Sequence, residues 1–147
     1  MTKNEEAVSS FCDGFLCSQA ILSVYGEEEG LERELALKLA TGLGGGMGRT
    51  AHTCGAVTGA ILVIGLKKGP VSVNDVAAKE ETYYLVREFL NRFQEKHGSL
   101  ICRDLLQCDI GTPEGYRRAC DKGLFDRICP HLVDSAVEIL EEMKKQE

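Results

Sequence analysis

Seven cysteines in a chain of 147 residues are the side chains best suited to do chemistry. A cysteine reacts or binds metal as a thiolate, and the free N–H groups and positive dipole at the start of a helix favour that form. Cys54 follows the glycine-rich stretch GGGMG at residues 44–48 and opens an apolar segment that ends at Leu66. We therefore expect Cys54 to begin a buried helix, with a lowered pKa and the fastest alkylation of the seven thiols.

Two further cysteines occur where capping signals predict the start of a helix. Gly98 breaks a helical pattern and Ser99 can cap the next helix, which places Cys102 in a first turn. Cys129 precedes Pro130, and proline favours the first helical position, so Cys129 is predicted to be the N-cap of the C-terminal helix.

A fourth cysteine, Cys17, is predicted on the apolar face of the first helix. If the three helix starts converge on it, four sulfurs meet in one electropositive pocket. Such thiolates can attack a disulfide, or they can hold a metal ion or an iron–sulfur cluster. No C-x-x-C motif is present, so the spacing does not choose between these chemistries and any pairing is long-range.

The other three cysteines are interpreted as buried or surface thiols without a chemical role, because free cysteine packs as a small apolar residue. They are Cys12, Cys108 and Cys120. Cys108 is the most interesting of them, since it lies six residues after Cys102, where the chain could fold back.

Four polar residues are secondary candidates. His52 and His131 each stand two residues from one of the helix-start cysteines and could accept a proton or bind a metal, although a solvated role is the favoured interpretation. Arg49 and Arg103 could place positive charge near the thiolates, with surface salt bridges as the ordinary alternative.

The helices that must position these residues follow from apolar periodicity, and no strand-like alternation is present. The sequence predicts an all-α bundle of about five to seven helices, with the glycine-rich loop before a buried central helix. Gly55 and Gly59 form a small-xxx-small face for close helix contact. The helices are expected over residues 4–25, 32–43, 54–66, from Ser72 or Asn74 to 97, from about 100, from Thr112-Pro113 to about 123, and from Pro130 onward.

Composition limits the class of protein. A hydrophobic content of 44% supports one domain, residues 1–147, with a full core, so the cysteines need not act as structural disulfides. The formal charge of −6 argues against nucleic acid as a partner. The acidic N-terminus does not resemble a secretory signal, and Ala56–Leu66 is too short to span a bilayer. We expect a cytoplasmic protein that does not insert into membranes.

The order of the motifs resembles the redox-active protein family named C_GCAxxG_C_C after its four cysteines. The resemblance covers nearly the whole chain and implies that Cys17, Cys54, Cys102 and Cys129 are those four, with a redox role. A similar domain occurs in multihaem and iron–sulfur electron carriers of anaerobic bacteria, but the haem-binding motifs are absent here. The matching elements are Cys17, the GGGMGR run, Cys54-Gly-Ala-Val-Thr-Gly59, Gly98-Ser-Leu-Ile-Cys102-Arg-Asp-Leu, and Cys129 with Leu132-Val133 beyond it.

Three hypotheses follow for function. The leading one is a cytoplasmic thiol/disulfide redox protein, with a thiol-disulfide oxidoreductase as its enzymatic form, that exchanges electrons with a partner protein or electron carrier through the four cysteines. The second is an electron-transfer protein that holds an iron–sulfur cluster or zinc with the same four cysteines. The third is a non-catalytic helical adaptor whose cysteines only pack.

Overall fold

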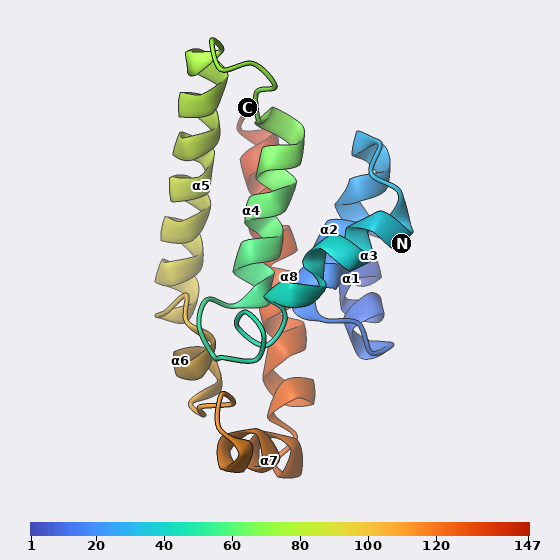
Figure 1. The fold of residues 1–147 in the computed structure, drawn as a ribbon, viewed down its shortest axis with the longest axis vertical. Coiled ribbons are helices and arrows are strands. Elements are labelled where there is room, and N and C mark those ends of the chain that lie inside the picture. Colours follow the sequence, from blue (N-terminus) through green and yellow to red (C-terminus); the bar gives the residue numbers. More distant parts are fainter.

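The computed structural model describes all 147 residues, and its regular elements are all helical (Figure 1). The all-α prediction is confirmed, with eight α-helices and two short 3-10 turns. The α-helices are α1 (Lys3–Cys12), α2 (Cys17–Gly26), α3 (Arg33–Ala40), α4 (Gly55–Lys68), α5 (Val76–His97), α6 (Cys102–Leu106), α7 (Pro113–Asp121) and α8 (Leu124–Lys145), and the 3-10 turns are η1 (Glu27–Glu29) and η2 (Thr41–Leu43).

Helix α4 lies near the centre of the structure. Helices α5 and α8 run beside it, and α2 packs on its other side, with α1 and α3 packed against α2 (Figure 1). Helices α6 and α7 lie at one end (Figure 1). Phe89 and Phe93 of α5 are fully buried in the main core, whereas Tyr84 of the same helix is exposed. None of the helices combines the length and the apolar character needed to cross a lipid bilayer.

The helix predicted over residues 4–25 is two helices. It breaks at Asp13 and Gly14, where Gly14 has φ +112°, a conformation that side chains rarely adopt. The new helix is capped when the side-chain oxygen of Gln19 accepts a hydrogen bond from the N–H of Leu16 (2.9 Å). Cys17 is therefore the first residue of α2, not a residue in the middle of a longer helix.

The C-terminal helix begins earlier than predicted. Gly123, with φ +64°, precedes the first residue of α8, and Pro130 lies inside the helix. Proline has no N–H, so the carbonyl of Asp126 loses its usual partner four residues on. Cys129 is consequently a buried residue within α8, and its prediction as an N-cap is wrong.

Helix α3 buries its alanines and exposes two of its leucines. Leu35 and Leu39 are 49% and 58% exposed, while Ala36 and Ala40 are fully buried. The small side chains allow α2 to come close, and the hydroxyl of Ser18 donates a hydrogen bond to the Ala40 carbonyl at 2.8 Å. The buried face of α3 is the one whose small side chains let the backbones of α2 and α3 come close. The face with the larger leucines is left exposed.

The small-xxx-small face of α4 packs against α2, as predicted. A Cβ atom added to Gly59 would lie 3.1 Å from the Cα of Ser18, and one added to Gly55 would lie 3.3 Å from the Cβ of Cys17. These distances leave little room for side chains at the two glycines. The contact places the start of α2, with Cys17, next to the start of α4.

The glycine-rich loop coils below the end of α4 (Figure 1). Every residue from Gly45 to Arg49 has a positive φ, and so does Ala51. The left-handed coil is closed by backbone hydrogen bonds, such as those from Gly48 to Gly42 (2.8 Å) and from His52 to Gly46 (2.9 Å). The predicted bend is confirmed, and its non-glycine members hold a conformation that costs roughly 1–2 kcal/mol each.

Two glycines of this coil give a matched stability test. Gly46 and Gly48 have similar φ values, +70° and +62°, but a Cβ at Gly46 would meet the His52 nitrogen at 2.6 Å and the Cβ of Cys102 at 2.8 Å. A Cβ at Gly48 would meet no atom within 4 Å. We expect Gly46→Ala to lower the free energy of unfolding by about 1–3 kcal/mol more than Gly48→Ala, measured by urea denaturation. Equal losses in the two variants would contradict this account of the loop.

Candidate functional site

Four cysteines from four helix regions line one cavity of about 570 Å³. Cys17, Cys54, Cys102 and Cys129 come from α2, the N-cap of α4, α6 and α8, respectively. The last three are buried and Cys17 is half-buried. The wall around them is mainly apolar, with side chains from α1, the glycine loop and α7 completing it.

An isolated antiparallel bridge between Thr53 and Ile101 sets the positions of two of these cysteines. The backbone N–H groups of Cys54 and Cys102 each donate a hydrogen bond across it, over 2.9 and 2.6 Å. Successive side chains of an extended segment point to opposite faces. Cys54 and Cys102 therefore share one face of the bridge and line the cavity, while Ile101 is exposed on the other.

The other two cysteines, Cys17 and Cys129, interact closely enough for each to shift the pKa of the other. The thiol of Cys17 donates to the sulfur of Cys129, and this bond raises the pKa of Cys17, with burial as a further cause. The same bond stabilises the Cys129 thiolate and lowers the pKa of Cys129, although burial and the carboxylate of Asp126 act in the opposite direction. Among Cys17, Cys54, Cys102 and Cys129, only Cys129 has a lowered pKa.

The prediction of a lowered pKa for Cys54 is wrong. Burial raises its pKa to about 11, and the N–H groups of Ala56 and Val57 in the first turn of α4 lower it by less than burial raises it. Burial likewise raises the pKa of Cys102 to about 12, with the nearby sulfurs of Cys54 and Cys129 adding to the effect. A helix start alone does not make a thiol acidic once water is excluded.

Of the secondary candidates, only Arg49 reaches the cavity. Its guanidinium lies 4.2 Å from the centre of the Tyr116 ring, and both residues line the cavity. His52 is exposed, with Nδ1 2.6 Å from the hydroxyl of Thr50, and His131 is exposed on α8. The remaining candidate, Arg103, is also exposed and away from the cavity wall.

The cysteines outside the four-cysteine pattern fall in three different environments. Cys120 is exposed on α7, in keeping with its interpretation as a surface thiol. Cys108 is buried, and its thiol donates a hydrogen bond to the carbonyl of Gly115 at 3.2 Å. Cys12 is exposed but also lines the cavity, which the sequence did not suggest. The Asp13-Gly14 pair that follows Cys12 was the available signal, because a turn there brings the end of α1 back towards Cys17.

As ligands, four thiolates suit zinc or an iron–sulfur cluster. No group of three or more His, Cys, Asp or Glu side chains is placed to hold a single metal ion.

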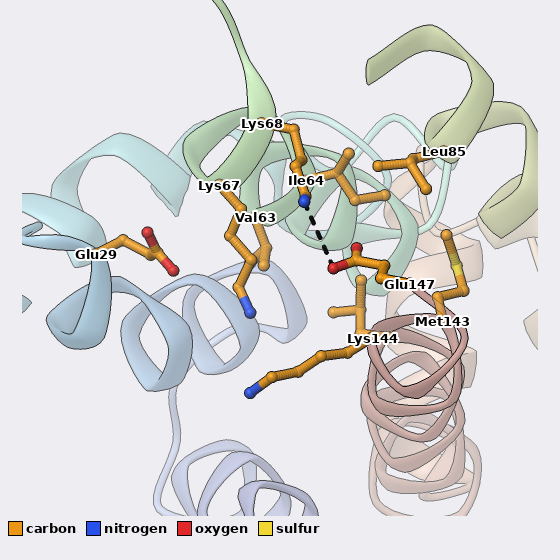
Figure 2. Close-up of a pocket in the computed structure, with 10 residues that line it drawn as sticks. Glu29, Val63, Ile64, Lys67, Lys68, Leu85, Met143, Lys144 and Glu147 are labelled. Carbon is orange, nitrogen blue, oxygen red and sulfur yellow. Dashed lines mark ion pairs between the residues drawn. The ribbon is translucent and has the colours of Figure 1, made fainter. Parts of the chain in front are cut away.

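A second, smaller pocket of about 260 Å³ lies between the ends of α4 and α8 and contains no cysteine (Figure 2). Lys67 and Lys144 extend into it, and Lys68 forms an ion pair with Glu147 at 3.4 Å. These lysines occupy the last turns of their helices, where positive charge balances the helix dipole. Their placement has a structural explanation, so this pocket is not part of the candidate site.

Comparison with known families gives the cysteine cavity a context. Residues 15–143 match the family described as "Putative redox-active protein (C_GCAxxG_C_C)". The chain belongs to this family. Cys17, Cys54, Cys102 and Cys129 of this C_GCAxxG_C_C protein all lie within the matched residues, and the resemblance noted in the sequence is confirmed. Neither a curated protein nor a solved structure matches the chain.

The hydrogen bond between Cys17 and Cys129 leads to a prediction about reactivity. Cys17→Ala removes the donor, so the pKa of Cys129 should rise and its alkylation near pH 7 should slow, about tenfold for each pKa unit. The rate can be followed by mass spectrometry of the tryptic peptide that spans residues 128–144. Cys17→Ser keeps a hydroxyl donor and should restore most of the rate. An unchanged rate in Cys17→Ala would show that the hydrogen bond does not control the thiolate.

Proposed function

We propose that this C_GCAxxG_C_C protein is a thiol redox protein that forms a reversible disulfide between Cys129 and Cys17. The observation that supports this proposal is that both cysteines line one cavity, where each shifts the pKa of the other. A thiolate beside a second thiol is the arrangement that thiol–disulfide exchange uses. The proposal also accounts for the redox activity that the family description carries.

The exchange proceeds in two steps. The Cys129 thiolate attacks one sulfur of a disulfide R–S–S–R, which forms a Cys129–S–S–R bond and releases one thiolate, R–S⁻. That thiolate takes the proton from Cys17, and the sulfur of Cys17 then attacks Cys129 and expels the second R–S⁻, which takes a proton from water. Two protein thiols are oxidised to one disulfide, and the substrate disulfide is reduced to two thiols. The reverse sequence oxidises a partner dithiol.

The cavity suggests how a partner is engaged. Its volume and apolar wall suit a small molecule or a side chain presented by another protein, and Cys129 lies against that wall. We propose a redox partner protein or small electron carrier, acting in the cytoplasm, where reducing systems return disulfides to thiols.

The test uses protein purified and handled without oxygen. We expect little bound iron, sulfide or zinc, and a two-electron transition in a thiol–disulfide redox titration that disappears in Cys129→Ser and in Cys17→Ser. Cys120→Ser, which alters an exposed thiol away from the cavity, should leave the transition unchanged.

Other results would overturn the proposal in different directions. Stoichiometric iron and sulfide with visible charge-transfer absorption, or stoichiometric zinc, would replace the dithiol with a metal centre. A protein with neither bound metal nor a titrating thiol pair would instead support the helical adaptor.

A further inference from the structure

The turn that ends α6 brings Cys108 back towards that helix. Gln107 has φ +52°, its N–H bonds to the carbonyl of Asp104 (3.2 Å), and the N–H of Cys108 bonds to that of Arg103 (3.1 Å). These two bonds define a Schellman motif, in which the second residue past the helix packs against the helix's preceding turn. In this motif that contact is with Arg103 or Cys102, the third and fourth residues before Leu106, and of these two only Cys102 is buried.

Burial places the two side chains in the same environment. Cys102 is 9% exposed and Cys108 is 6% exposed, and both belong to a buried cluster that also contains Cys129. The Cys108 sulfur is among the charges that raise the pKa of Cys102, which agrees with a short separation between them. Cys102 lines the cavity and Cys108 does not, so Cys102 is the accessible member and Cys108 stands behind it.

We propose that Cys102 and Cys108 form a second dithiol, which takes over the disulfide made first between Cys17 and Cys129. This inference rests on the proposed thiol redox function and adds to it a reaction of a cysteine that lies outside the four-cysteine pattern. An ordinary alternative is that Cys108 is only the apolar contact that accompanies a Schellman turn. The two accounts differ in whether Cys108 ever loses its thiol.

The transfer balances as a pair of thiol–disulfide exchanges. Cys102, as its thiolate, attacks the Cys129 sulfur of the first disulfide, which forms a Cys102–Cys129 bond and releases Cys17 as a thiolate. Cys17 accepts the proton that Cys102 gave up. Cys108 then attacks Cys102 and releases the Cys129 thiolate, and the Cys108 proton passes to solvent. One disulfide has moved without net oxidation, and the Cys17–Cys129 dithiol is ready for a second substrate disulfide.

A second dithiol would double the number of electrons that one protein molecule can deliver. The reduced protein would deliver four electrons to two molecules of a disulfide substrate, ending with one disulfide in each dithiol. The hydrogen bond from Cys108 to the Gly115 carbonyl would be given up in the second disulfide, so the first turn of α7 would lose one contact with the segment after α6.

The experiment maps disulfides in the wild-type chain. The reduced protein is oxidised with glutathione disulfide, its free thiols are blocked with N-ethylmaleimide, and trypsin digestion follows without reduction. Trypsin cuts after Arg103, which separates Cys102 from Cys108, so a bond between them appears as two linked peptides. With excess oxidant we expect two linked pairs, Cys17 with Cys129 and Cys102 with Cys108. With one equivalent we expect mainly the Cys102–Cys108 pair.

Alternative outcomes distinguish failure of this inference from failure of the proposed function. If Cys108 is blocked by N-ethylmaleimide in the fully oxidised protein while Cys17 and Cys129 are linked, the second dithiol does not exist and the first one stands. A bond from Cys102 to Cys54 or to Cys129 as the final product also overturns it. If no cysteines become linked, both proposals fail.

A pair of variants provides the control. Cys108→Ala should halve the number of thiols lost on full oxidation, whereas Cys120→Ala, at the exposed cysteine of α7, should leave that number unchanged. An unchanged number in Cys108→Ala would contradict the inference. The peptide map of the wild-type chain decides the question even if the variant at this buried position folds poorly.

Discussion

The contact between α2 and α4 is the constraint on which the site depends. The two helices meet through Gly55 and Gly59, where an added Cβ would lie only 3.1–3.3 Å from atoms of α2. Atoms at such distances are already at the limit of van der Waals contact, so larger side chains would force the helices apart. Because the contact includes the first turns of both helices, it fixes Cys17 beside the chain that carries Cys54. The left-handed coil before α4 is the route by which the chain enters this crowded position.

Burial explains why the acidic thiol is not the one at the most obvious helix start. A helix N-terminus contributes about 0.3–1 kcal/mol to a nearby negative charge, less than one pKa unit at about 1.4 kcal/mol per unit. Burial can shift a pKa by several units in the opposite direction. Cys54, within the core, therefore has a raised pKa despite its position. Cys129 has the advantage of a direct hydrogen bond from the thiol of Cys17.

Local sequence signals predicted the helix ends that depend only on the residues of a single turn. Gly98 ends α5, Thr112 caps α7, and Cys54 caps the apolar helix α4, all as expected. The predictions were wrong where contacts between residues far apart in the sequence determine the structure. Apolar spacing continues across the break at Gly14, so periodicity could not reveal it. Pro130 resembles a helix start in isolation, but residues on both sides of it are buried in one continuous helix, and their tertiary contacts outweigh the missing N–H.

The helix break near Gly14 and the missing hydrogen bond at Pro130 give Cys17 and Cys129 a different backbone environment from that of Cys54 and Cys102. Cys54 and Cys102 are each held by a backbone hydrogen bond across the Thr53–Ile101 bridge, so their main chains are fixed on both sides of the site. Cys17 directly follows the break after α1, and Cys129 directly precedes Pro130, where the helix lacks one backbone hydrogen bond. Disulfide formation requires the Cα atoms to approach within about 7 Å. Because Cys17 begins a helix after a break and Cys129 stands beside a missing helical bond, this pair can make that adjustment with less loss of backbone hydrogen bonding than Cys54 and Cys102.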